Sequence, residues 1–409
     1  HVVLQAFHIT IFIFFETLYI FPAICAKICL PIEKYGGFIM SNKQTYIHFT
    51  NVLQQLNCDI AFIQDPTTIS LLTHYTTDPH ERVLAMVVSA NHSPLLFVPA
   101  LEKNMAQAAE PTYTVISYQD HENPWEILTS AIQKQFDSPT KWAVEKNFIT
   151  LHTVENLKKE LSEIQWTDDL TPIINDLRLR KDDDAIQKLK DSGTYADKAV
   201  EVGIQSLKEG ITELEVVAKI EYEMKKLGIT SMSFDTMVLF GDHAADPHGV
   251  PGDRTLRKNE WVLFDLGTMH NGYASDMTRT IFFGEENAKN VRHQEIFNIV
   301  KTAHDLAIQA VKPGMKASEI DAIARNYITE KGYGEYFIHR LGHGIGQSCH
   351  EFPSIMEGND MILEEGMCFS VEPGVYIAKD YGVRVEDCLV VTKEGCELFT
   401  HFPQEITKY

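Results

Sequence analysis

The sequence lacks the features of several common protein classes. Its seven cysteines include no C-x₂-C pair and no framework spacing, so we expect reduced thiols rather than a zinc finger or disulfide scaffold. Basic residues are scarce, with 36 Lys and Arg against 57 Asp and Glu. The resulting formal net charge of −21 disfavours binding to nucleic-acid phosphates and predicts a cytoplasmic protein. Internal repeats are not evident.

The first residues raise a separate question, because residues 9–30 form an apolar run long enough to suggest a membrane anchor. The run contains Glu16 and Lys27, and a charge near the bilayer centre costs roughly 2.5–3.5 kcal/mol. The stretch YGGFIM resembles a translated ribosome-binding site with Met40 at the position of a start codon. We therefore expect residues 1–41 to be a non-native leader extension. A membrane anchor and a folded extension are the alternatives.

From Asn42 onward, helical and strand-like patterns alternate, which predicts an α/β fold. The runs RVLAMVVSA and PLLFVPA are separated by a turn signal and predict a hairpin. The expected organisation is a small N-terminal domain, a charged linker containing proline, and a larger C-terminal domain, at residues 42–170, 171–184 and 185–409. Long helices are expected in the C-terminal domain at Asp183–Glu209, Glu213–Leu227, Glu295–Val311 and Ala317–Lys331.

Four acidic residues lie in or next to apolar strands of this C-terminal domain. Asp265 ends one predicted strand and Asp276 begins another eleven residues later. Glu372 lies in CFSVEPGVYI, and Glu386 lies in GVRVEDCLVVT. Acidic side chains are depleted in strand interiors because a buried carboxylate needs a partner. Their recurrence predicts a site that binds cations.

A histidine-rich stretch, FIHRLGHGIGQSCHEFP, contains His339, His343 and His350. Adding His343 to the four carboxylates gives a ligand set suited to Mn²⁺, Co²⁺ or Zn²⁺. Four negative charges are better balanced by two divalent ions than by one, which points to a two-metal hydrolase. Cys349 has no partner that would make it a nucleophile, and we expect it to be a buried small side chain.

The order Asp-x₁₀-Asp, GHG, VEPG and VE resembles that of the metallopeptidases of the pita-bread fold, above all the bacterial Xaa-Pro dipeptidases, or prolidases. The resemblance extends from about Asn42 to the C-terminus. It implies a creatinase-like N-terminal domain followed by a catalytic pita-bread domain. It also implies that one metal ion is bound by Asp265 and Asp276. The other would be bound by Asp276, His343, Glu372 and Glu386, with Asp276 and Glu386 bridging both ions.

The same resemblance implies roles for residues around the metal ions. A hydroxide bridging the ions would be the nucleophile, and Glu372 would shuttle protons. His248 and His350 would donate hydrogen bonds to the substrate and the oxyanion. His339 matches a position lining the proline-side pocket.

The resemblance also implies roles for two arginines. Arg384 shares a predicted strand face with Glu386 and would support ligand carboxylates or bind the substrate carboxylate, and Arg340 is a second candidate for that clamp.

These observations predict an enzyme that hydrolyses the Xaa-Pro bond of dipeptides with two divalent metal ions, Mn²⁺ being expected before Co²⁺ or Zn²⁺. The enzymatic alternative is an aminopeptidase P, which removes the residue before proline from longer peptides. A non-catalytic interaction protein is a further alternative. The expected partners are small peptides with proline in second position and a second copy of the chain in a homodimer. We expect no nucleic-acid partner, and no membrane partner unless residues 9–30 form an anchor.

Overall fold

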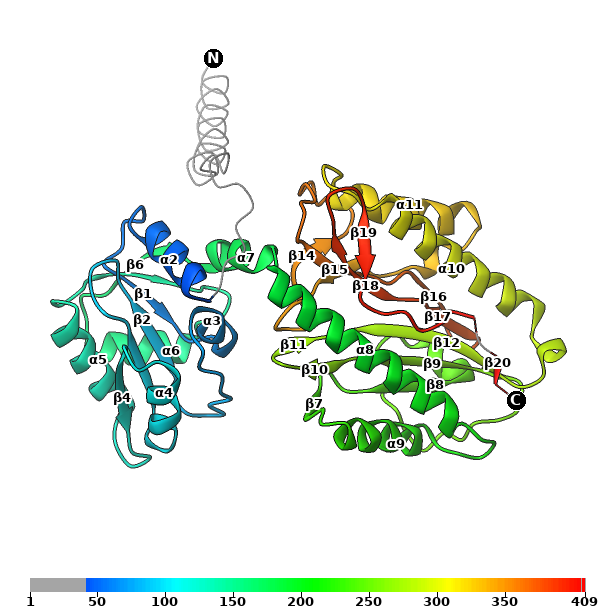
Figure 1. Ribbon diagram of the computed structural model, residues 1–409, viewed down its shortest axis with the longest axis horizontal. Helices are drawn as coiled ribbons and strands as arrows, with labels where there is room; N and C mark the ends of the chain where they lie inside the picture. Colours follow the sequence, from blue (N-terminus) through cyan, green and yellow to red (C-terminus); the bar gives the residue numbers. More distant parts are fainter. Residues whose placement is uncertain (1–41, 406, 409) are drawn as a thin grey trace, which may run out of the picture. The chain divides into compact units, whose positions relative to one another are not determined.

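The computed structural model describes residues 42–405 and 407–408 (Figure 1). The predictions made for residues 1–41, including the possible anchor, lie outside the described residues. Within the described range, no helix combines the length and the apolar character needed to cross a bilayer.

A six-stranded mixed sheet forms the core of the N-terminal part, with strand order β4-β3-β2-β1-β5-β6. The strands are β1 (Ile60–Ile63), β2 (Ala85–Val88), β3 (Leu95–Pro99), β4 (Thr114–Tyr118), β5 (Lys141–Val144) and β6 (Gln165–Asp169). The helical elements are α2 (Asn42–Leu53), α3 (Pro66–Leu72), η1 (Ala100–Glu102), α4 (Lys103–Ala109), α5 (Pro124–Gln135), α6 (Leu151–Glu160) and α7 (Thr171–Leu179).

Alternate residues of these strands contribute to two hydrophobic clusters, one on each face of the sheet. Phe49 of α2 and Ile69 of α3 pack on one face, together with Ile174 of α7. Trp125 of α5 and Leu157 of α6 pack on the other, and Figure 1 shows the two groups of helices on opposite sides of the sheet. Helices therefore cover both faces, as in other α/β folds.

Two helix pairs, each followed by strands, make up the C-terminal part. The helical elements are α8 (Asp183–Ser206), α9 (Glu213–Lys226), η2 (Gly241–Ala245), η3 (Glu286–Ala288), α10 (Val291–Ala310), α11 (Ala317–Glu330) and η4 (Gly334–Tyr336). The strands after the first pair are β7 (Ser231–Met232), β8 (Met237–Phe240), β9 (Glu260–Leu266), β10 (Thr268–His270), β11 (Tyr273–Ala274) and β12 (Met277–Phe283). The strands after the second pair are β13 (Gly342–Gly344), β14 (Glu351–Ile355), β15 (Cys368–Val371), β16 (Gly374–Ile377), β17 (Tyr381–Arg384), β18 (Asp387–Val391), β19 (Cys396–Leu398) and β20 (Thr407–Lys408).

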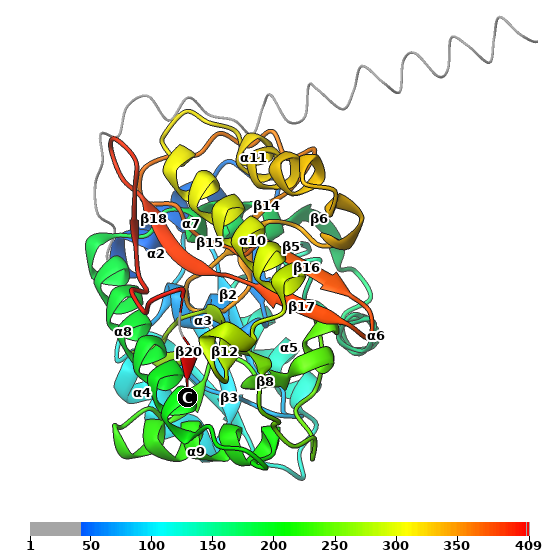
Figure 2. The same ribbon diagram turned by 90° about the vertical axis from the view of Figure 1, so that its right-hand side faces the viewer.

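The two larger sheets have the orders β20-β12-β9-β8 and β14-β13-β15-β18-β19. Helices α8 and α9 pack on the first of these sheets through residues such as Val200, Ile220 and Phe264. Helices α10 and α11 pack over the second through residues such as Val300 and Phe369. Figure 2 shows α10 in front of β15 and β18, while α11 lies beside β14. One helix pair therefore covers one face of each of these two sheets.

Local sequence signals account for most element boundaries. The predicted hairpin is confirmed, because β2 and β3 pair antiparallel. At the start of α9, Thr212 and Glu215 form a capping box. Asp182 caps α8, and its side chain accepts a hydrogen bond from the backbone N–H of Ala185.

Two segments differ from the expected secondary structure. The predicted linker at residues 171–184 contains helix α7, in which Ile174 is buried. The single strand predicted for GVRVEDCLVVT is two strands, β17 and β18, and Glu386 lies in the break between them. The break occurs because β17 pairs with β16 whereas β18 pairs with β15.

Candidate metal centre

Strands β9 and β12 provide two of the predicted ligands. They pair antiparallel, with Thr278 opposite Asp265, and Asp276 immediately precedes β12. Asp276 is 4% exposed, and Asp265 is only partly exposed. The hairpin between the strands therefore brings together two carboxylates that are eleven residues apart in the sequence.

His343 and Glu372 come from the other large sheet. The backbone N–H of His343 in β13 donates to Ser370 Oγ of β15, at 3.1 Å. The same Ser370 hydroxyl donates to Glu372 Oε1, also at 3.1 Å. Glu372 follows β15 directly, and its backbone N–H donates to the carbonyl oxygen of Leu341. As a result, Glu372 Oε1 lies 3.3 Å from His343 Nε2.

Glu386 joins the two sheets. Its backbone N–H donates to the carbonyl oxygen of Thr278, and its Oε2 accepts a hydrogen bond of 2.7 Å from the Thr278 hydroxyl. The next residue, Asp387, points elsewhere and forms a buried ion pair with Arg279. The two neighbouring side chains therefore point in different directions, with Glu386 facing the other predicted ligands and Asp387 facing away.

Among the described residues, Asp276, His343 and Glu386 each offer a ligand atom, and these atoms all lie within 4.8 Å of one another. Asp265 is connected to this group through Arg384, which forms an ion pair with Asp265 and donates to the Thr278 hydroxyl. Together with Glu372, the structure gathers all five predicted ligands in one region.

The electrostatics of this region are unfavourable without a cation. Burial, and then the charges of Asp265 and Glu372, raise the pKa of Asp276 well above its usual value. Burial and the charge of Asp276 likewise raise the pKa of Glu386. Burial lowers the pKa of His343 to about 3, so its imidazole is neutral at physiological pH. Neutral imidazole and carboxylate are the states that bind metal ions.

The orientation of His343 tests whether a metal ion would fit. Its Nδ1 lies 3.1 Å from the carbonyl oxygen of Gly344, which assigns the ring proton to Nδ1. Nε2 then presents a lone pair toward Asp276 Oδ2 at 3.5 Å and Glu372 Oε1 at 3.3 Å. In addition, Glu386 Oε1 is buried with no hydrogen-bond partner among the described residues. Lone pairs that converge in this way need a cation between them, so the residues fit a divalent metal site.

The other predicted histidines lie beside the ligands. His350 as a whole residue is exposed, but its ring packs beside that of His343, with the two centroids 4.1 Å apart. His248 is also exposed, and its charge is a small contribution to the lowered pKa values of His339 and His350. For His350, as for His339, burial is the larger cause of the lowered pKa. The structure thus brings His350 beside the predicted ligand His343.

His339 is held more firmly than the other two. Its ring lies between Phe337 and Tyr376, at centroid distances of 5.1 Å and 5.5 Å. Its Nε2 is 3.1 Å from the Tyr376 hydroxyl, and its Nδ1 is 2.7 Å from the carbonyl oxygen of Arg340. Burial lowers the pKa of His339 to about 4, so the ring is neutral near neutral pH.

The two predicted arginines have different surroundings. Arg384 is buried, and its donors are taken by Thr278, the Tyr376 hydroxyl and Asp265. Arg340 is partly exposed and donates through Nη1 to the Ser354 hydroxyl at 2.9 Å. Of the two, Arg340 has the more accessible guanidinium, whereas Arg384 is paired with the predicted ligand Asp265.

Several contributing residues were not identified from the sequence. Thr278, Ser370 and Tyr376 each hydrogen-bond a ligand or its support, and each lies within four residues of a predicted ligand in a strand. Cys349, expected to be an inert buried side chain, is buried but its Sγ lies 3.1 Å from Asp276 Oδ2. Burial and the charge of Asp276 raise the pKa of this thiol, which agrees with the prediction that it is not a nucleophile.

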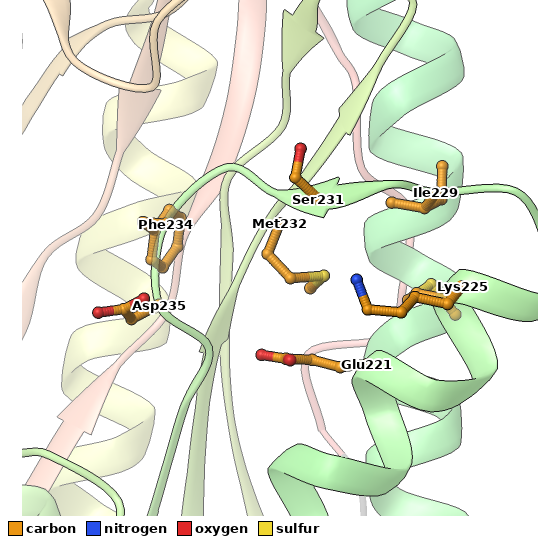
Figure 3. A pocket seen from close by; sticks show the side chains of 8 residues that line it. Glu221, Lys225, Ile229, Ser231, Met232, Phe234 and Asp235 are labelled. Atoms are coloured by element: carbon orange, nitrogen blue, oxygen red, sulfur yellow. The ribbon is translucent and has the colours of Figure 1, made fainter. Parts of the chain in front are cut away.

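A cavity of about 260 Å³ lies elsewhere, between α9 and the segment around β7 (Figure 3). It is lined by Glu221, Met224, Lys225, Ile229, Ser231, Met232, Phe234 and Asp235, and none of these is a predicted site residue. Lys225 Nζ donates to the carbonyl oxygen of Thr230, and Glu221 Oε1 accepts from the Thr236 hydroxyl. Because these two charged groups already have partners within the protein, we assign no ligand to this cavity.

Buried carboxylates and a neutral imidazole gathered in this way define a site for divalent metal ions. Residues 187–393 match the model of metallopeptidase family M24, and residues 48–180 match the creatinase/prolidase N-terminal domain. The chain therefore belongs to metallopeptidase family M24. The predicted family and the predicted fold, a creatinase-like domain followed by a catalytic domain, are confirmed.

Three known proteins illustrate the similarity. The chain is 46% identical to an Xaa-Pro dipeptidase of Lactobacillus delbrueckii subsp. lactis, over 87% of this chain and 96% of that protein. It superimposes on an Xaa-Pro dipeptidase from Bacillus anthracis with a TM-score of 0.82 at 30% identity, covering 90% of this chain and 99% of the other. It also superimposes on an X-Pro aminopeptidase from Thermotoga maritima with a TM-score of 0.76 at 27% identity, covering 87% and 99%.

Proposed function

We propose that the protein is an Xaa-Pro dipeptidase that hydrolyses the bond before proline in dipeptides. The observation that supports this most directly is the group formed by Asp276, His343 and Glu386, whose lone pairs converge without a cation. Asp265 and Glu372 complete the five ligands, in the order that resembles the prolidases. The similarity to the Lactobacillus Xaa-Pro dipeptidase supports the substrate.

Two divalent metal ions are the proposed cofactors, with Mn²⁺ ahead of Co²⁺ or Zn²⁺, because four carboxylates favour hard cations. When bound, they would supply Lewis-acid polarisation of the scissile carbonyl and a lowered pKa for the attacking water. Asp265 and Asp276 would hold one ion, and Asp276, His343, Glu372 and Glu386 the other. Metal analysis of the native protein tests this assignment, and fewer than two equivalents per chain would contradict it.

The chain's own residues would position the peptide and move its protons. Glu372, fixed through Ser370, is the proposed proton shuttle to the proline nitrogen. His248 and His350, which are both exposed, would donate hydrogen bonds to the substrate and to the developing oxyanion.

His339 and Arg340 are the proposed contacts of the proline residue. His339 packs against the rings of Phe337 and Tyr376, which suits the apolar proline ring. Arg340 retains donors beyond the one bound to Ser354, so we propose that it binds the C-terminal carboxylate of the dipeptide. Arg384, whose donors are occupied by Thr278, Tyr376 and Asp265, would instead keep the ligands in place.

We also propose that the protein is a cytoplasmic homodimer. The net charge of −21 supports a cytoplasmic protein, and the family resemblance supports the dimer. Sedimentation equilibrium of the purified protein tests the dimer, and a single species at monomer mass would contradict it.

A comparison of peptide lengths tests the proposed reaction. Mn²⁺-loaded protein should cleave an Xaa-Pro dipeptide with a kcat/KM at least about tenfold above that for the matching Xaa-Pro-Yaa peptide. The opposite preference would indicate an aminopeptidase P, the function named for the Thermotoga structure. Failure to cleave either peptide, in protein that contains both metal ions, would indicate a non-catalytic protein.

A further inference from the structure

Cys349 makes a contact that the proposed chemistry has not used. It lies between β13 and β14, directly before His350, and its side chain is 8% exposed. Its Sγ is 3.1 Å from Asp276 Oδ2. A thiolate at this distance would be repelled by the carboxylate, so the contact is an S–H donor facing a carboxylate acceptor.

This thiol has no substitute around Asp276. Among the described residues, Cys349 is the one hydrogen-bond donor to the Asp276 carboxylate. Asp276 Oδ2 lies 3.5 Å from His343 Nε2, whose lone pair cannot donate to it when the ring proton is on Nδ1. The thiol is therefore the hydrogen-bond donor that the described residues offer to this buried carboxylate.

A second observation indicates that the group around Asp276 binds a cation. Glu386 is 1% exposed, and its Oε1 has no partner among the described residues although it belongs to the same group as Asp276 and His343. An unpartnered carboxylate oxygen buried beside Asp276 indicates that the group is completed by a positively charged ligand.

We propose that Cys349 is a positioning residue of the metal centre, whose S–H group holds Asp276 in the orientation that binds the metal ions. This inference rests on the proposed function, because it takes Asp276 as a shared ligand. A change in the orientation of a shared carboxylate alters its bonds to both ions, so a weak hydrogen bond can affect the whole centre. Cys349 acts through Asp276 and does not touch the substrate.

Cobalt binding to the metal-free full-length protein tests this role without depending on activity. Co²⁺ is titrated into the wild type and into Cys349→Ala and Cys349→Ser, and binding is followed by visible absorption and by metal content after dialysis. Cys349→Ala should bind Co²⁺ about 3- to 10-fold more weakly, because Asp276 loses its donor. Cys349→Ser supplies a hydroxyl donor and should stay within about threefold of the wild type.

Cys368→Ala is the matched control. Cys368 is a fully buried thiol of the same hydrophobic cluster, but its Sγ faces the carbonyl oxygen of Gly366 at 3.6 Å. This variant should bind Co²⁺ as the wild type does. Thermal denaturation of the metal-free proteins separates folding defects from binding defects, since Cys349→Ala and Cys368→Ala should lose similar stability.

Two results would overturn the inference while leaving the proposed function intact. One is unchanged Co²⁺ affinity in Cys349→Ala. The other is equal weakening in Cys349→Ala and Cys349→Ser, which would show that sulfur packing matters and the hydrogen bond does not. A wild type that cleaves no Xaa-Pro peptide and binds no Co²⁺ would instead contradict the proposed function itself.

Discussion

Lys181 and Glu351 form an ion pair of 2.9 Å although 170 residues separate them and their side chains are only 5% and 3% exposed. Lys181 lies between α7 and α8, and Glu351 directly follows His350. Glu351 Oε1 also accepts the backbone N–H of Ser348. The pair therefore ties the segment between two helices to the loop that presents Cys349 and His350.

Removal of one partner should destabilise the protein strongly. Lys181→Met would leave Glu351 as an uncompensated buried charge, and we expect the free energy of unfolding in urea to fall by about 3–5 kcal/mol. Lys181→Met combined with Glu351→Gln should recover most of this loss, because the neutral amide can still accept the Ser348 N–H.

The control for this experiment is Lys258→Met. Lys258 pairs with Glu209 at 3.9 Å on the surface, with both side chains mostly exposed, so the change should stay within about 0.5 kcal/mol. A Lys181→Met protein as stable as Lys258→Met would show that the buried pair contributes nothing.

Substitution of a proposed ligand should lower the bound metal content, the turnover rate, or both. Asp276→Asn removes a charge shared by both ions, so bound Mn²⁺ should fall below two equivalents and kcat should fall at least about 10²-fold. Glu372→Gln should likewise abolish turnover. Metal content by mass spectrometry and single-substrate kinetics check both, and an Asp276→Asn protein with full metal content and normal kcat would refute the two-metal assignment.

His339→Ala should act mainly on substrate binding. The ring contacts Phe337 and Tyr376 but is not among the ligands, so we expect KM for an Xaa-Pro dipeptide to rise about tenfold with kcat within about threefold. His80→Ala, at an exposed position of the N-terminal part, is the control. If kcat fell as far as in Asp276→Asn while KM stayed constant, His339 would have to act in the chemical step.

The positions of the ligands could be predicted because strand periodicity leaves a clear signal. Four acids in apolar strands need partners, and the alternation of Arg384, Glu386 and Asp387 correctly separates the residues that face the site from the one that does not. The match to family motifs then assigns His343 among several histidines.

Long-range contacts that no family motif marks could not be predicted. The Lys181–Glu351 pair and the Cys349–Asp276 hydrogen bond join residues from different sheets and loops, and no local pattern specifies them. The break between β17 and β18 also depends on which strands lie alongside, because each pairs with a different neighbour. Tertiary pairing, rather than local preference, decides these features.

The protein's stability should depend on pH through Glu145 in the N-terminal part, independently of the metal centre. Its Oε1 accepts a hydrogen bond of 2.7 Å from Thr68, while its Oε2 is buried with no hydrogen-bond partner among the described residues. Arg178 is directed to Asp65 and Thr68 instead of to Glu145. Burial therefore raises the pKa of Glu145 to about 7.

Because this pKa is higher in the folded than in the unfolded state, the folded state binds the extra proton between about pH 4.5 and pH 7, and stability falls as pH rises through that window. Glu145→Gln keeps the acceptor for Thr68 and removes the titration. We expect it to exceed the wild type by about 2–3 kcal/mol in the free energy of unfolding at pH 8, and by less than about 1 kcal/mol at pH 5. Glu126→Gln, on the exposed face of α5, should show no such difference. A gap between Glu145→Gln and the wild type that is the same at both pH values would mean that Glu145 titrates normally in the folded protein.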